Sequence, residues 1–538
     1  MSRTAAFLIL LSFLTFFIGL GRPAIGDADE AYYAEAAREM VDTGDLLTPH
    51  YNYADRWQKP VLFYWVTAAT YFVTGPSEWS ARSWSALSGI GLVLLTWAIA
   101  RRTLRREDTA WLAGAIVATC YGYFFMARQA LPDLPLAFFI TLTIWSTIER
   151  RWTLAAVAAG LGFLTKGPVA LIVPAVVLVP VWWHERSWPT VADLAVAAII
   201  FGLVGLPWYL AMTLRHGTPY LESFFVGDNL ERFATTRFNG PRFVLYYVPI
   251  VIGGMLPWAM YLLVLPWRRG IDVLRRRQRL AVEEWRLVAW AVAPLVFFTL
   301  SVGKQPRYIL PVLPPLAILV AQSISKRLAP ADDASRGERA LAVATWLTAG
   351  TLMALAALLV RARPLFITAY PLLTVVSVLA LIVCSLVTAA VVITRRWSRL
   401  PLTLTAVSAV TLLALQFGAL SGVRPEPVEQ MTALIRAHRS SEPIGEYRVF
   451  VRNMVFYVRD RQTELFTDAG ALDFMKSPRR ALLVVRNEDL QRLEQISGQT
   501  WHRLGEVRYV DTATIRLRAL LWPIPEEDVD RVFLVANQ

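Results

Sequence analysis

Carboxylates gather where the chain leaves its first apolar run. The segment 26–40 reads GDADEAYYAEAAREM and carries Asp29 and Glu30 near its start. Carboxylates at a membrane surface can act as general bases or bind a cation. A helix that begins here would instead use Asp27 or Asp29 as its N-cap and Glu30 in its first turn, where negative charge is favourable. The residue types alone leave the catalytic and the capping roles equally open.

A second acidic residue, Asp133, lies in the segment RQALPDLPL, where a loop enters another apolar run. Charges at the edge of a membrane span that face a cavity are functional more often than not. The structural alternative is a helix N-cap after Pro132. We therefore take Asp133 as a second candidate for chemistry.

Three of the five lysines in the chain each stand beside a turn residue. Lys59, Lys166 and Lys304 occur in the segments QKP, TKGP and GKQP. A compact ammonium beside a glycine-opened backbone or a helix start suits a phosphate. Interfacial snorkelling is the alternative, but arginine, which this chain prefers, would serve that purpose equally well. If the three lysines converge, they predict an anion site for a lipid phosphate headgroup.

The elements that must position these residues are membrane helices. The chain has 538 residues, of which 56% are hydrophobic and 18% charged. Apolar runs long enough to cross a bilayer recur throughout, and helices satisfy their own backbone in lipid. We expect an all-α polytopic membrane protein with about 13 spans, near 5–21, 79–100, 108–127, 132–149, 152–164, 167–184, 191–213, 243–266, 285–302, 308–325, 341–360, 365–393 and 400–421. The shorter run 61–73 favours an interfacial helix.

Basic residues between the spans indicate an orientation. With the N-terminus in the cytoplasm, the inner loops hold about three times the Lys and Arg of the outer ones, as the positive-inside rule requires. These inner loops are 101–106, 149–151, 268–279, 326–339 and 395–396. The net charge of +13 then reflects topology and not nucleic-acid binding. The acidic residues and the three lysines fall on the outer face, whose two longer loops are about 22–78 and 214–242.

The last hundred residues differ in composition from the rest. We predict a transmembrane domain over 1–423 and a small extracytoplasmic α/β domain over 424–538, with a supporting or substrate-shielding role. Periodicity favours helices at 427–438 and 488–496, and strands at 447–451, 481–485, 506–510, 514–520 and 532–536. Cys120 and Cys384 both lie in apolar runs, which indicates core positions and neither a disulfide nor a metal pair.

Four motifs in one order carry a resemblance to a known family. They are DEAYYAE from residue 29, WQKPVLFYW from 57, GFLTKGP from 162 and GKQPRYILP from 303. The chain resembles the bacterial GT-C membrane glycosyltransferases, in the branch of the protein O-mannosyltransferases and the aminoarabinose–lipid A (ArnT-like) transferases. The resemblance extends over the whole chain and is strongest in its membrane part.

The resemblance implies inverting transfer of a sugar from a polyprenyl-phosphate donor to an envelope lipid, glycan or protein. The reaction would take place at the outer face of the bacterial inner membrane, in a monomer. It implies Asp29 as the base that activates the acceptor, with Asp133 and Glu30 as the other acidic residues. The residues implied to hold the donor phosphate are Lys59, Lys166 and Lys304, with Tyr33, Arg232 and Tyr308 nearby.

The chain departs from the family pattern at three positions. Gln58, Tyr32 and Asn229 stand where the aminoarabinose transferases usually carry Glu, Arg and His. That Glu and His are linked to a metal ion in the family, whereas amides are poor ligands for a transition metal. The changes favour a lost metal site, with a divalent metal as the open alternative, and they leave the sugar and the acceptor undefined.

Two other function classes fit the sequence less well. A transporter or flippase for a lipid-linked glycan would favour internal repeats and polar groups at the bilayer midplane. We find no convincing repeat, and the candidate residues crowd one face. A non-catalytic scaffold would leave the outer lysines and the acidic motif without a role. The sequence therefore favours an enzyme.

Overall fold

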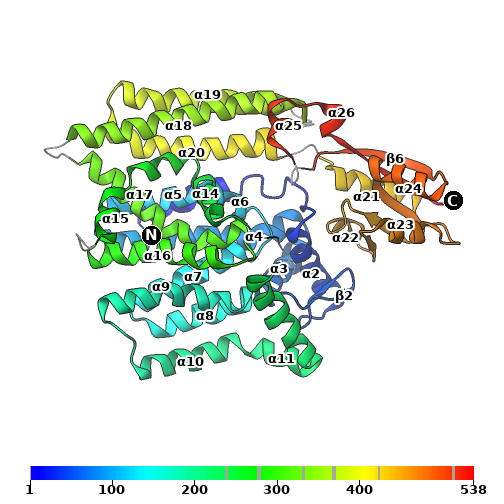
Figure 1. Cartoon of the computed structure of the whole chain (residues 1–538), viewed down its shortest axis with the longest axis horizontal. Coiled ribbons are helices and arrows are strands. Elements are labelled where there is room, and N and C mark those ends of the chain that lie inside the picture. The colour runs from blue at the N-terminus through cyan, green and yellow to red at the C-terminus, as the bar shows by residue number, and fades with distance from the viewer. Residues whose placement is uncertain are drawn as a thin grey trace.

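Helices make up most of the chain in the computed structural model (Figure 1). The structure describes residues 2–236, 240, 242–275, 280–329, 334–365, 371–421, 424–511 and 515–538. Parts of the predicted basic loops 268–279 and 326–339 lie outside the described residues, as does part of the predicted span 365–393.

The first loop is itself structured and lies between α1 (Arg3–Phe16) and α4 (Glu78–Leu104). It holds α2 (Asp29–Thr43), the short hairpin of β1 (His50–Tyr51) and β2 (Ala54–Asp55), and α3 (Leu62–Thr74). The predicted interfacial helix 61–73 is α3, so its helical structure is confirmed, while its place at a membrane surface stays a prediction.

The rest of the helical part follows in chain order among the described residues. Its first half comprises α5 (Glu107–Ala118), α6 (Tyr121–Ala127), α7 (Asp133–Ile148), α8 (Trp152–Lys166), α9 (Val169–Glu185), α10 (Val191–Gly205), α11 (Pro207–His216), α12 (Thr218–Leu221), η1 (Glu222–Leu230) and α13 (Glu231–Ala234). Its second half comprises η2 (Val244–Tyr246), α14 (Tyr247–Met255), η3 (Trp258–Val264), α15 (Trp267–Leu274), α16 (Val282–Leu300), η4 (Pro306–Val312), α17 (Leu313–Leu328), α18 (Ala334–Ala362), η5 (Arg363–Leu365), α19 (Pro371–Ile393), η6 (Trp397–Arg399), α20 (Leu400–Leu415) and η7 (Gln416–Leu420).

The lengths and composition of these helices confirm a multi-pass membrane protein. Among the described residues, five helices are long and apolar enough to cross a bilayer, and eight if each of three bent pairs counts as one span. Five shorter apolar helices accompany them, including α7, α8 and α9. The fold class is therefore confirmed, whereas the count of about 13 spans stays a prediction.

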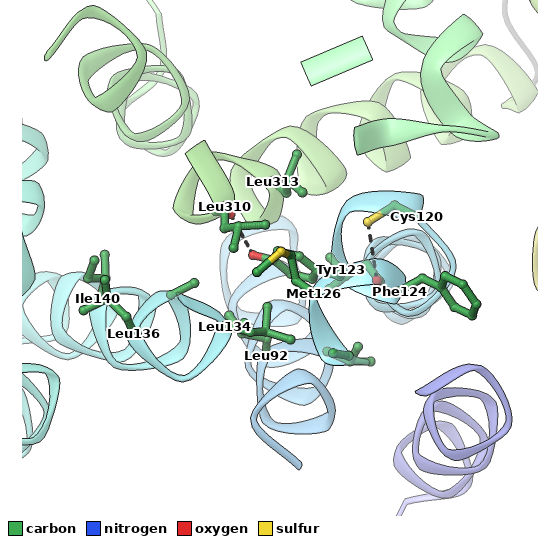
Figure 2. Close-up of a cluster of buried hydrophobic side chains, with 14 of the residues drawn as sticks. Leu92, Cys120, Tyr123, Phe124, Met126, Leu134, Leu136, Ile140, Leu310 and Leu313 are labelled. Carbon is green, nitrogen blue, oxygen red and sulfur yellow. Dashed lines mark hydrogen bonds between the residues drawn. The ribbon is translucent and has the colours of Figure 1, made fainter. Parts of the chain in front are cut away.

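A buried apolar cluster fixes the helix ends that matter for function. Figure 2 shows Leu92 of α4, Tyr123 of α6, Leu134 of α7 and Leu313 of α17 packed together. The Tyr123 hydroxyl donates to the carbonyl of Leu310 at 2.8 Å, which ties α6 to η4 (Figure 2). This packing holds the start of α7 beside η4. Cys120 and Cys384 are both buried, so their predicted core positions are confirmed.

A five-stranded mixed sheet forms the C-terminal part, at the right of Figure 1. Its strand order is β4 (Thr463–Leu465), β3 (Ile444–Tyr447), β5 (Leu482–Arg486), β7 (Asp530–Ala536) and β6 (His502–Tyr509). β3 pairs in parallel with β4 and β5, and β7 pairs antiparallel with β5 and β6. The helices here are α21 (Pro427–His438), α22 (Met454–Val458), α23 (Asp468–Met475), α24 (Asn487–Ser497), α25 (Leu517–Leu521) and α26 (Pro525–Asp528).

The predicted C-terminal elements are mostly present, with two corrections. The strand predicted at 447–451 is wrong in position, because β3 ends at Tyr447. The strand predicted at 514–520 is also wrong: residues 517–521 form helix α25, and residue 514 lies outside the described part. Short apolar runs fit either period, so the alternation there could not separate strand from helix.

The C-terminal part packs on the first loop. The Arg452 amide donates to Asp27 Oδ1 at 2.7 Å, and the Asn453 amide group donates to the Ile25 carbonyl at 2.8 Å. The Ile25 amide in turn donates to the Tyr457 hydroxyl at 2.7 Å. The segment that precedes α2 is therefore held from both sides, by the membrane helices and by the sheet domain.

Candidate active site

A cavity of about 1040 Å³ lies where α2, η1 and η4 meet the ends of α7 and α8. Seven of the nine predicted site residues line it: Asp29, Tyr33, Lys59, Asp133, Lys166, Arg232 and Tyr308. Its wall also includes apolar side chains such as Ile140, Val173 and Phe297. A hollow that combines charged groups with an apolar wall suits a ligand with a polar head and a lipid tail.

The charged residues reach the cavity because helices begin or end beside it. Asp29 is the first residue of α2, Asp133 the first of α7, and Lys166 the last of α8. The N-cap positions belong to Ala28 and Pro132, and neither makes a side-chain capping bond. The N-cap alternative is therefore wrong for both acidic residues, and their carboxylates are available to other partners.

One arginine joins the two carboxylates. The Arg307 guanidinium donates to the Asp29 carboxylate, and its Nε lies 3.4 Å from Asp133 Oδ1. Lys166 Nζ donates to the same oxygen of Asp133 at 2.5 Å. The Asp29 side chain is 48% exposed and that of Asp133 only 4%. The Asp29 carboxylate is therefore accessible from the cavity. Asp133 is buried and binds both Lys166 and Arg307.

Asp29 is ionised at neutral pH. Burial alone would raise the pKa of its carboxyl, but the Arg307 guanidinium beside it holds that pKa below the usual range. Lys166 and Arg232 act in the same direction from farther away. An ionised carboxylate that is exposed to the cavity can accept a proton from a bound hydroxyl.

A second group of cations lies around Asp228. Lys59 Nζ is 3.8 Å from Asp228 Oδ1, and Arg232 Nη2 is 3.1 Å from the same oxygen. Burial lowers the pKa of Lys59 to about 7; Asp228 opposes this change, and Arg232 adds to it. Lys166 Nζ lies 5.5 Å from the centre of the Tyr308 ring. These ammonium and guanidinium groups can together hold a phosphate.

Two predicted residues do not line the cavity. Glu30 is buried and accepts from Arg82 Nε at 2.8 Å, from the Ala130 amide at 2.8 Å and from the Gly26 amide at 2.9 Å. Lys304 is 7% exposed and donates to the Ser301 carbonyl in its own loop at 2.5 Å. The Glu30 carboxylate is thus bound to protein groups outside the cavity lining, and the Lys304 ammonium is bound to a backbone carbonyl.

Four charged residues of the cavity wall were not predicted as site residues from the sequence: Arg56, Asp228, Arg307 and Arg452. Arg307 stands in the GKQPRY motif and Asp228 in GDNLERF, so both were close to residues already singled out. The Arg56 guanidinium lies 4.0 Å from the centre of the Tyr32 ring. Arg452 comes from the sheet domain and donates to the Tyr32 hydroxyl at 3.2 Å. No local signal in the sequence connects Arg452 to this site.

The residues at the family's metal positions do not fit a transition-metal ion. Gln58 and Asn229 both line the cavity, but their side chains are amides. Asn229 Nδ2 donates to the Phe224 carbonyl at 2.7 Å. Across the described part of the chain, no three His, Cys, Asp or Glu side chains are grouped to hold a metal. We derive no step of the chemistry through a metal.

Comparisons with known proteins agree with this geometry. The family model for dolichyl-phosphate-mannose-protein mannosyltransferases matches residues 6–216. The undecaprenyl phosphate-alpha-4-amino-4-deoxy-L-arabinose arabinosyl transferase 2 of Proteus mirabilis is 30% identical over 334 residues, which cover 60% of this chain and 59% of that protein. The corresponding transferase of Pseudomonas aeruginosa (strain LESB58) is 32% identical, with 61% of this chain and 60% of that protein covered. The chain thus matches about three fifths of the length of these curated relatives.

Solved structures extend the likeness to the whole fold. ArnT from Cupriavidus metallidurans, bound to undecaprenyl phosphate, has a TM-score of 0.73 at 22% identity and covers 99% of this chain and 98% of its own. The Archaeoglobus fulgidus oligosaccharyltransferase has a TM-score of 0.54 at 11% identity, with 94% of this chain and 69% of its own covered. At these identities the likeness concerns the fold alone. By sequence over residues 6–216 and by fold over its length, the chain is similar to ArnT and to the dolichyl-phosphate-mannose-protein mannosyltransferase family.

Proposed function

We propose that the chain is an inverting glycosyltransferase that moves a sugar from a polyprenyl-phosphate donor to an envelope acceptor. The observation that carries this proposal is one cavity in which the carboxylate of Asp29 faces the ammonium groups of Lys59 and Lys166. Relatives named as arabinosyl transferases that use an undecaprenyl-phosphate sugar support the same donor class. The acceptor is a lipid, a glycan or a protein, and the working form is a monomer.

The chemistry follows from the charges. Asp29 takes the proton of an acceptor hydroxyl while the oxygen of that hydroxyl bonds to the anomeric carbon of the donor sugar. The bond from that carbon to the phosphate oxygen breaks, and polyprenyl phosphate leaves with the electron pair. Lys59, Lys166 and Arg232 stabilise the negative charge that grows on the phosphate. Asp133 holds Lys166 and Arg307 in place for this step.

We place the reaction at the outer face of the bacterial inner membrane. Helix α7 runs 16 residues, roughly 24 Å, from Asp133 in the cavity to the basic end of the bundle. At that end Arg102 lies 3.2 Å from Glu149. These two residues line a second cavity together with Ser2, near the N-terminus. Basic loops favour the cytoplasmic side. The N-terminus is then cytoplasmic, and the cavity and the sheet domain are periplasmic.

The experiment that tests the function compares cells with and without this chain. Mass spectrometry of envelope lipids, glycans and glycoproteins should reveal a sugar adduct that depends on the chain. The adduct would identify both the sugar and the acceptor. Transfer should then be reconstituted with purified protein, and an unchanged set of adducts together with no transfer from polyprenyl-phosphate sugars would contradict the proposal.

Lys166→Ala should weaken binding of undecaprenyl phosphate by about tenfold to a hundredfold, the size of one hydrogen bond to a charged group. Acceptor affinity should change much less. Native mass spectrometry of the purified protein in detergent can measure the binding. Lys326→Ala is a matched control, since Lys326 is exposed and pairs with Glu284 outside the cavity at 3.3 Å. Equal affinity for undecaprenyl phosphate in Lys166→Ala and the parent would contradict the role of Lys166 in binding the phosphate.

Donor binding should weaken as the pH rises past about 7, because the pKa of Lys59 is lowered to about 7 and its ammonium is then lost. Below that pH the lysine is charged and binding should be independent of this group. Lys59→Arg should keep its affinity at pH 8.5, since arginine stays protonated. The measurement is the ratio of the undecaprenyl phosphate dissociation constants of the parent and Lys59→Arg between pH 5.5 and 8.5, because the titration of the phosphate itself cancels in that ratio. A ratio that does not change with pH would contradict the role of Lys59.

A further inference from the structure

Asp228 is a carboxylate among the cations that would hold the donor phosphate. It is 6% exposed, lines the cavity, and faces Lys59 at 3.8 Å and Arg232 at 3.1 Å through one oxygen. Arg232 Nε also donates to the Asp228 carbonyl at 3.2 Å. A negatively charged group therefore already occupies part of the place of a bound phosphate.

The position of Asp228 is set by an unusual helix. η1 is a π-helix over Glu222–Leu230 and continues into α13 at Glu231. π-helical turns are rare and frequent at functional sites. Phe224, 1% exposed, anchors this segment: a methyl group in place of the Gly167 hydrogen would lie 2.7 Å from its ring. The backbone near Asp228 is held by this close packing against the end of α8.

The charge balance explains why an anion is placed here. The described lining of the cavity contains six basic side chains, Arg56, Lys59, Lys166, Arg232, Arg307 and Arg452, and four carboxylates, Asp27, Asp29, Asp133 and Asp228. Asp29 and Asp133 pair with Arg307 and Lys166, and Asp27 accepts from the Arg452 amide. Asp228 alone among the four pairs with Lys59 and Arg232. Asp228 therefore offsets the mutual repulsion of these two cations.

We propose that Asp228 is an internal counter-ion, which pairs with Lys59 and Arg232 before the donor binds and competes with the donor phosphate for them. This inference rests on the proposed function. When the donor binds, its phosphate takes over these two cations. After transfer, Asp228 pairs with them again and so weakens the hold on the polyprenyl phosphate product. Asp228 is thus a positioning residue that lowers the affinity for polyprenyl phosphate and so speeds release of this product.

Asp228→Asn tests the competition, because it removes the charge at nearly constant shape. Undecaprenyl phosphate should bind about tenfold more tightly to the variant, the size of one charge-assisted contact. The KM for the donor and kcat should both fall, since release of the product becomes slower. Asp228→Glu should restore parental values. Binding is best measured at pH 5.5, where Lys59 keeps its proton.

Glu222→Gln is the matched control, as Glu222 begins the same π-helix but is exposed and does not line the cavity. A purely structural role for Asp228 would give the opposite result: weaker binding, a raised KM and an unchanged kcat. That outcome would overturn the proposal. If Asp228→Asn does not fold, Asp228→Ser removes the same charge and the same tightening is expected.

The binding measurement needs no sugar transfer, so the two proposals fail separately. If Asp228→Asn binds undecaprenyl phosphate more tightly but the protein transfers no sugar, the counter-ion proposal stands and the proposed glycosyltransferase function fails. If the protein transfers sugar but Asp228→Asn binds undecaprenyl phosphate equally or more weakly, the glycosyltransferase function stands and the counter-ion proposal fails.

Discussion

Asp29→Asn is expected to lower sugar transfer about a thousandfold, within the range that positioned general bases contribute. The carboxylate is the half-exposed acid of the cavity and is kept ionised by Arg307. An amide has nearly the same shape but cannot accept the proton of the acceptor hydroxyl. Donor binding should survive, because Lys59, Lys166 and Arg232 remain in place.

The measurement pairs initial rates of transfer with binding of undecaprenyl phosphate to the same preparation. Asp42→Asn is a close control: Asp42 lies on the same helix, its side chain is also 48% exposed, and it pairs with Arg38 outside the cavity. Full transfer by Asp29→Asn would exclude Asp29 as the base. Loss of both transfer and thermal stability would instead indicate that the Asp29–Arg307 pair is chiefly structural.

The sequence was most informative where apolar runs end. Asp29, Asp133 and Lys166 stand at such edges, and each is the first or last residue of a helix in the structure. Helix termini at a common membrane depth converge, so charges placed there share one cavity. That is why the membrane fold and most of the site could be predicted without coordinates.

The sequence did not show which of two neighbouring charged residues faces the cavity. Glu30 follows Asp29 directly, yet one step along a helix turns a side chain by about 100°. This rotation takes Glu30 to the buried Arg82 and leaves Asp29 facing the cavity. Lys304 and Arg307 differ similarly, because η4 begins at Pro306 and brings Arg307, not Lys304, to the carboxylates.

Long-range contacts were beyond the sequence altogether. Arg452 and Tyr32 are 420 positions apart and meet only because the sheet domain packs on the first loop. No period or motif encodes this docking. The boundary between the two parts near residue 424 stays a prediction, while the contact gives the C-terminal part a direct place in the cavity wall.

Glu30→Gln is expected to destabilise the protein by about 3–5 kcal/mol, because it leaves a buried guanidinium without its anion. Glu30 and Arg82 are 2% and 1% exposed, and two hydrogen bonds of 2.8 and 3.0 Å join them. Arg82 also donates to the carbonyls of Leu20, Pro23 and Ala24. The pair therefore closes the segment that leads into α2 and Asp29.

The readouts are the midpoint of thermal unfolding and the rate of transfer per folded molecule. We expect the midpoint to fall and the rate per folded molecule to change little. The double variant Glu30→Gln with Arg82→Gln should recover part of the stability, since no uncompensated charge remains. Glu149→Gln, which breaks the pair with the exposed Arg102, should cost at most about 1 kcal/mol. If Glu30→Gln abolished transfer at an unchanged midpoint, Glu30 would act in the chemistry itself. The catalytic role assigned to Asp29 and the structural role assigned to Glu30 would then have to be exchanged.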